Sequence, residues 1–172
     1  TIYTKSGAVD GDLEISNSGN PSPLTEGLTT VSDTLTFDNV TIDNYANVTI
    51  SSAVTVDSTL TLQNYAHLNV AAAANITYST FTWQTNSNLV DNGGTFALFS
   101  GGGALTIPTT TTLSGNATRS FTTGTIDGTL THTSNGASHT YDTDYTFSGN
   151  VTVGGSVNVN AKGYSSSNGT GQ

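Results

Sequence analysis

The stretch DNYANVTISSAVTVDSTLTL, Asp43–Leu62, is followed directly by QNYAHLNVAAAANITYSTFTW, Gln63–Trp83. With one residue inserted, the two segments align over their whole length, and apolar positions match apolar positions, as Val48 matches Leu68. The period is therefore 20 to 21 residues. Repeats of this length indicate a solenoid, in which each unit buries its apolar face only by stacking on its neighbours.

Short segments throughout the chain alternate apolar and polar residues, as strands with one buried face do. Val, Ile and Thr crowd a helix backbone, and Ser, Asn and Gly favour turns. We therefore expect an all-β chain folded as a parallel β-helix (β-solenoid) with coils of about 20 residues. At most one short helix and at least three stacked coils between Val31 and Phe99 are expected. The alternative is an antiparallel jelly roll or β-sandwich, which uses the same short strands.

The expected core consists of the large apolar residues of the alternating segments. These are Leu35, Phe37, Val48, Ile50, Leu60, Leu62, Leu68, Val70, Phe81 and Trp83.

The start of the repeat predicts two stacking ladders, because equivalent residues of successive coils lie about 4.8 Å apart. Asn44 lies over Asn64, which predicts an inward amide ladder, and Tyr45 lies over Tyr65, which predicts an aromatic stack.

Composition divides the chain into three parts. Residues 1–30 are expected to form an N-terminal cap or exchangeable strand with a loop, since GNPSPLTEG (Gly19–Gly27) carries two prolines that cannot donate to a central ladder. Residues 31–160 are expected to form the β-solenoid. Residues 161–172 are rich in Gly and Ser and are expected to be a tail or linker.

The charge balance excludes several classes of partner. The net charge is −9, only 9% of residues are charged, and there is no cysteine. Nucleic acid and anionic lipid both need basic surface, so neither is expected as a partner. No apolar run is long enough to insert in a membrane. Without cysteine the chain has no disulfide and no thiolate site.

One acidic cluster is a weak candidate for calcium. Asp10, Asp12 and Glu14 alternate along VDGDLEI, and Ca²⁺ takes several oxygen ligands. The segment lacks a calcium-loop motif, so the favoured interpretation is an exposed turn followed by a charged strand edge. We expect no metal and no cofactor.

Two further groups are candidates for catalytic or metal sites. Asp142 and Asp144 in YDTDY have a spacing that two carboxylates for glycoside hydrolysis could have. The Asp set and Gly-His-Gly of pectin-degrading β-helices are missing, so we expect no enzyme activity. The three histidines, His67, His132 and His139, are expected to be turn or surface residues rather than convergent zinc ligands.

Surface residues leave two other functions open. Thr-x-Thr pairs resemble the rows of ice-binding solenoids, although the residue between is large and apolar in each pair, as in ordinary alternation. These pairs are Thr34/Thr36, Thr59/Thr61, Thr80/Thr82 and Thr129/Thr131. Tyr45, Tyr65 and Trp83 are candidate aromatic platforms if the chain is a carbohydrate-binding module of a phage tail fibre or adhesin that takes surface glycans.

The segments TLTL, VTV and VNVN running into KGYSSSNGTG resemble the β-helical passenger regions of large bacterial surface proteins, of the filamentous-haemagglutinin and autotransporter kind. The likeness covers Val31 to Gly171. It implies a secreted, extracellular, cell-surface protein that is a filament component or an adhesin module, and it supplies no catalytic residues.

Assembly is expected through open sheet edges, which recruit other chains unless they are capped. The segment TIYTKSGAV, with Thr1, Ile2, Tyr3 and Val9, is a candidate strand to donate to a neighbouring subunit. The expected partners are therefore further copies of the chain, in a homopolymer, or covalently neighbouring modules.

Overall fold

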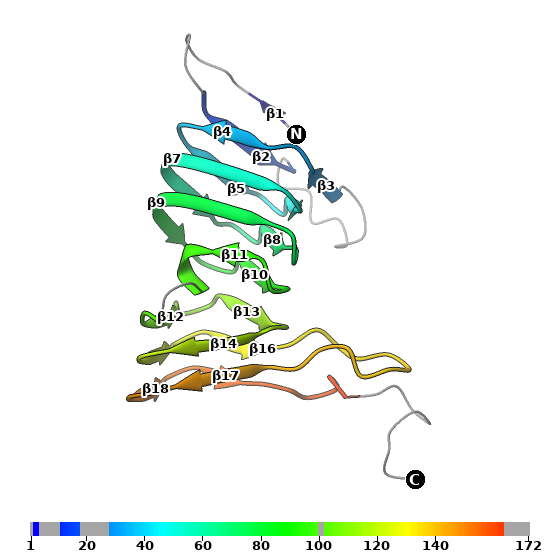
Figure 1. Ribbon diagram of the computed structural model, residues 1–172, viewed down its shortest axis with the longest axis vertical. Helices are drawn as coiled ribbons and strands as arrows, with labels where there is room; N and C mark the ends of the chain where they lie inside the picture. The colour runs from blue at the N-terminus through cyan, green and yellow to red at the C-terminus, as the bar shows by residue number, and fades with distance from the viewer. Residues whose placement is uncertain (1, 4–10, 18–27, 100–101, 164–172) are drawn as a thin grey trace.

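The computed structural model describes residues 2–3, 11–17, 28–99 and 102–163, and its strands stack in successive coils along one axis (Figure 1). Apart from one 3-10 turn, η1 (Ala97–Phe99), the regular structure of these residues is all strand. The strand pairs are parallel, with the exception of β1 (Ile2–Tyr3) and β2 (Leu13–Ser16). The predicted parallel β-helix is confirmed, and the antiparallel sandwich is wrong because successive coils run in the same direction.

The described strands form four ladders. The first contains β1, β2, β4 (Leu35–Phe37), β5 (Val40–Asp43), β7 (Ala53–Leu62), β9 (Asn75–Trp83) and β11 (Thr95–Phe96). The second contains β3 (Leu28–Val31), β6 (Asn47–Ile50), β8 (His67–Val70), β10 (Asn88–Asp91), β13 (Thr112–Gly115), β16 (Thr129–Thr131) and β19 (Ser156–Val157). The third contains β12 (Leu105–Ile107), β15 (Gly124–Ile126) and β18 (Val151–Val153). The fourth contains β14 (Thr118–Phe121) and β17 (Asp144–Phe147).

The second ladder shows how the sequence repeat becomes a stack. Val48 pairs with Leu68, and Leu68 pairs with Leu89, which are offsets of 20 and 21 residues. The next partners in this ladder are Leu113 and Leu130, at offsets of 24 and 17 residues. The register thus follows the repeat while it lasts and continues after the sequence similarity has faded.

The core lies between the ladders, where alternate residues of each strand meet. Most of the predicted core residues are buried, with Leu35 and Phe81 as the exceptions. Leu35 is 37% exposed because β4 pairs with β7 on one side and has no described strand on its other side. Phe81 is half-buried because the first ladder is interrupted beside it.

This interruption, which we call the seam, separates β9–β11 from β12–β14. Across the seam the second ladder continues through β10 and β13, whereas the other ladders stop. Aromatic rings fill the interior there, with Phe96 at centroid distances of 5.0 Å from Tyr78, 5.1 Å from Phe81 and 5.5 Å from Phe99. Burial raises the pKa of Tyr78 to about 12. The described residues contain no helix long and apolar enough to cross a membrane.

Candidate functional site

The C-terminal end of the solenoid is a set of strands with one partner each. β17 pairs with β14, β18 with β15 and β19 with β16, and the described residues place no strand on their other edges. Their outer backbone groups therefore point along the axis without a ladder partner, and such edges template the addition of another strand.

Valine side chains at this end continue the buried columns of the core. In the second ladder, Leu113 is 0% exposed and Leu130 is 4% exposed, but Val157, the next residue of the same column, is 56% exposed. In the third ladder, Ile107 and Ile126 are 0% and 2% exposed, whereas Val153 is 52% exposed. Val151 and Val159 are also among the exposed large apolar residues. The end thus presents an apolar face that one more coil would cover.

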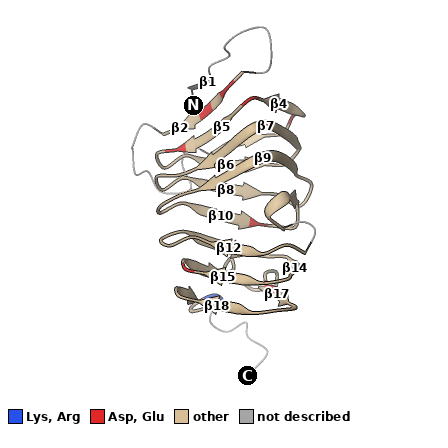
Figure 2. Ribbon diagram, turned by 90° about the vertical axis from the view of Figure 1, so that its left-hand side faces the viewer, with Lys and Arg blue, Asp and Glu red and all other residues tan. Residues whose placement is uncertain are grey.

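The N-terminal end differs. There β1 pairs with β2 in the antiparallel direction, through Ile2 with Glu14 and Tyr3 with Leu13. An antiparallel strand on this edge interrupts the parallel ladder, so the two ends are unequal. Figure 2 shows acidic residues gathered near β2 and β4 at this end. Of the predicted donor strand, Thr1 and Val9 lie outside the described residues, and Ile2 and Tyr3 pair within their own chain.

Of the two predicted ladders, the tyrosine stack forms and the asparagine ladder does not. The rings of Tyr45 and Tyr65 stack with centroids 4.8 Å apart and planes 5° apart. Asn44 and Asn64, however, do not form an inward ladder. Both lie in turns with a φ of 50°, and the side chain of exposed Asn64 donates to the carboxylate of Asp43 at 2.7 Å. Short polar residues tolerate this left-handed conformation. The two asparagines therefore occupy equivalent turns of successive coils and do not form a ladder of buried amides.

The asparagine ladder occurs elsewhere and was not found from the sequence. Asn92 donates to Asn69 at 2.5 Å, and Asn116 donates to Asn92 at 2.7 Å and to the hydroxyl of Thr133 at 2.8 Å. Asn69 in turn donates to Thr49. These half-buried side chains follow the edge of the second ladder over five coils, at spacings of 20, 23, 24 and 17 residues.

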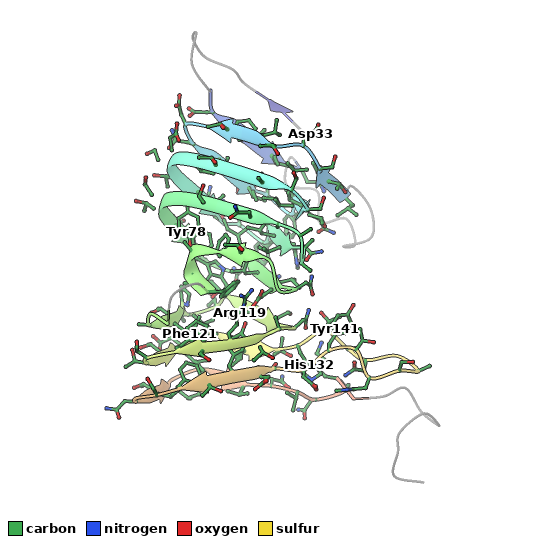
Figure 3. All side chains as sticks on the ribbon, in the orientation of Figure 1. Asp33, Tyr78, Arg119, Phe121, His132 and Tyr141 are labelled. Carbon is green, nitrogen blue, oxygen red and sulfur yellow. The ribbon has the colours of Figure 1, made fainter. Side chains whose placement is uncertain are left out.

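A buried ion pair at the seam was also missed. The carboxylate of Asp91 is 0% exposed and accepts from the guanidinium of Arg119, with Nε 2.7 Å from Oδ2. The hydroxyl of Tyr145 donates to the same oxygen at 3.2 Å. Figure 3 shows Arg119 at the level of the seam, where its side chain is 16% exposed and its guanidinium carbon lies 5.1 Å from the centre of the Phe99 ring. The bond to Asp91 raises the pKa of Arg119, and burial raises the pKa of Tyr145.

The chain has no match among protein-family models, curated proteins or solved structures. Its function therefore has to be inferred from the geometry of the chain itself.

The calcium candidate is not gathered into a site. Asp10 lies outside the described residues, and exposed Asp12 accepts a hydrogen bond from Asn39 at 2.8 Å. Asp12, Glu14 and Asn39 line a shallow polar hollow of about 330 Å³ with several threonines. The described part of the chain holds no group of three or more His, Cys, Asp or Glu residues placed to bind a metal ion.

The paired aspartates of YDTDY take separate partners. Exposed Asp142 accepts from His139 at 2.6 Å, and exposed Asp144 accepts from the hydroxyl of Thr118 at 3.0 Å. Of the other two histidines, buried His132 contacts the carbonyl of Thr133. His67 lies in the second ladder with Nε2 3.0 Å from Nδ2 of Asn88, and burial lowers its pKa.

Threonine rows do form on the outside of the first ladder. The register aligns Thr41 with Thr61 and Thr61 with Thr82, and it aligns Thr59 with Thr80. The rows stop at the seam. The pair Thr129/Thr131 does not form part of an exposed row, because Thr131 is buried, with 7% of its surface exposed.

Proposed function

We propose that this chain is a non-catalytic structural module of an extracellular filament or adhesin, and that its C-terminal end carries a further β-solenoid coil. The observation that supports this function is the set of exposed valines on open parallel edges, at the point where two buried columns would otherwise continue.

Physical chemistry favours a strand-bearing partner for this end. Covering an apolar residue is worth about 25 cal/mol for each Å² removed from water. The edge groups gain a second benefit, since a stacked coil pairs them with its own N–H and C=O groups. A sugar or an isolated apolar molecule would cover the valines and leave these groups without a ladder partner.

The inequality of the two ends sets the direction of growth. The antiparallel β1 covers β2, and β3 and β4 keep an open side at this end, whereas at the other end β17, β18 and β19 are all open in the described residues. A contact between unlike ends does not close on itself and generates a line of modules. Residues 164–172 contain Tyr164 as their single large apolar residue, so these nine residues do not carry the alternating apolar side chains of a coil.

The first test is to add the missing coil. A chain in which the segment 131–157, one full coil by the pairing of Leu130 with Val157, is repeated once after Val157 should have a higher unfolding midpoint, because each repeat is stabilised by its neighbour. An equally long Gly/Ser-rich extension is the control. An unchanged midpoint in both chains would contradict the proposed role of this end.

The second test separates a filament from a covalent module. Light scattering and electron microscopy are applied to the chain and to the variant Val151→Thr, Val153→Thr and Val157→Thr. Association that disappears in the variant supports a filament built through this end. If both chains remain monomeric while the added coil of the first test raises the unfolding midpoint, the adhesin module is the better description.

A further inference from the structure

A second unpaired place lies within the solenoid, at the seam. Trp83 lies six residues before Leu89, and in the next coil Ile107 lies six residues before Leu113, the ladder partner of Leu89. The register therefore brings β12 to the place below the second half of β9. Yet among the described strands the second half of β9 pairs with β7 alone, and β12 pairs with β15 alone.

Between these two strand edges lies a hollow of about 370 Å³. None of its lining residues is charged, in a chain whose net charge is −9. They are Phe81, Thr82, Trp83, Leu98, Thr106 and Pro108. The side chain of Trp83 is 9% exposed in all, and its indole N–H has no hydrogen-bond partner in the described structure. The wall of the hollow thus contains a buried donor that is unpaired in the described structure, where buried polar groups are almost always paired.

The backbone of both edges points toward this hollow. The N–H of Leu105 donates to Thr123, and the carbonyl of Ile107 accepts from Asp127, so both residues bond toward β15. Alternate residues of a strand bond to opposite sides, and the N–H and C=O of Thr106 therefore face away from β15. The bond from Gln84 to Leu62 places the backbone groups of Trp83 on the hollow side by the same alternation.

We propose that this hollow is an acceptor slot for an extended, uncharged peptide strand of a second protein. The peptide pairs with β9 and β12 through its backbone and places an apolar side chain against Phe81, Trp83 and Leu98. Strand addition takes its affinity from main-chain hydrogen bonds and its specificity from alternate side chains. A charged side chain is disfavoured, because it would lose its water against a neutral lining.

The chain offers its own reporter and its own probe. Trp83 is the single tryptophan, so intrinsic fluorescence reports on the slot directly. The probe is the acetylated and amidated peptide STLTLQ, the sequence of residues 58–63, which already pairs with this half of β9 from the other side. The expected result is a saturable change in fluorescence. The peptide STDTDQ, which differs only in its two apolar residues, should give none.

Variants at Thr106 test the backbone contact. Thr106→Pro removes one N–H from a strand edge, where proline is tolerated, and should weaken peptide binding about fivefold, as the loss of one hydrogen bond of about 1 kcal/mol does. Thr106→Val keeps the N–H and should bind as the original chain does. Equal binding by both variants would overturn the proposal.

Hydrogen exchange on the unaltered chain gives a reading that does not depend on a variant. The Thr106 amide should exchange freely without peptide and become protected when STLTLQ is bound. Protection without peptide would show that β9 and β12 pair directly, and the slot would not exist. Absence of any saturable peptide signal, or a fluorescence change with maltotriose that Thr106→Pro leaves intact, would also overturn the peptide proposal.

Discussion

Asp91 and Arg119, 28 residues apart in the chain, form a two-point ion pair inside the solenoid, with Nε and Nη2 of the arginine bound to the two carboxylate oxygens. In the column that Asp91 occupies, the two preceding coils carry Ile50 and Val70. Arg119 also donates to the carbonyl of Gly94 at 2.8 Å, so the pair joins β10 to the far side of the seam.

Removing one partner of this pair should destabilise the chain strongly. Asp91→Leu leaves a largely buried guanidinium without its carboxylate, and we expect a loss of about 3–5 kcal/mol in the free energy of unfolding, measured in urea. Asp91→Leu combined with Arg119→Leu should recover most of this loss, because two apolar residues replace two buried charges. A single variant as stable as the original chain would contradict the structural role of the pair.

Replacing an asparagine of the ladder should lower the stability of the chain more than replacing an exposed asparagine elsewhere. Asn92→Ala removes both the acceptor of Asn116 and the donor to Asn69, and we expect a loss of about 1–2 kcal/mol by chemical denaturation. Asn75→Ala is the matched control at an exposed position and should change stability by less than about 0.5 kcal/mol. Equal losses from the two substitutions would show that the ladder adds nothing beyond ordinary strand packing.

Gly115 lies where no side chain fits. A Cβ at this residue would stand 2.6 Å from the ring of Tyr145, which is itself held against Phe121 and Asp91. Gly115→Ala should therefore cost about 1–3 kcal/mol through overpacking. Gly103→Ala, whose Cβ would meet nothing within 4 Å, should leave the thermal midpoint almost unchanged. Equal thermal midpoints for the two variants would contradict this prediction.

His67 should make the fold sensitive to mild acid. Burial lowers its pKa below the ordinary 6.5, so the unfolded chain takes up a proton at a pH at which the folded chain does not. The contribution of neutral His67 is therefore complete above pH 6.5 and is lost as the pH falls toward the folded pKa.

The matched variant is His67→Asn, because asparagine stands at both neighbouring positions of this ladder, Asn47 and Asn88. Unfolding midpoints are compared at pH 7.5 and pH 5. The drop on acidification should be smaller in the variant, and the other two histidines cancel in the comparison. An identical drop in both chains would exclude His67 as its source.

Much of the fold was predictable because its causes are local. The repeat that places Val48 over Leu68 fixes a parallel register, and the alternation within each strand fixes which side faces inward. The Tyr45 and Tyr65 stack follows from the same register. The Asn44 and Asn64 prediction had the correct spacing and the wrong direction, because two residues can align along a solenoid in a turn as well as in the core.

The features at the seam and at the ends depend on the tertiary structure. No motif joins Asp91 to Arg119, or places Trp83 and Thr106 on the same hollow, since each pair is brought together only after a full coil of irregular length has closed. The exposure of Val153 and Val157 is likewise invisible in a sequence where buried Val48 and Val70 have the same alternating surroundings. The sequence by itself determined the coil, because coil formation needs only periodic apolar residues. The tertiary structure alone decided which strands of successive coils pair, because strand pairing depends on how many residues each loop inserts before the next strand begins.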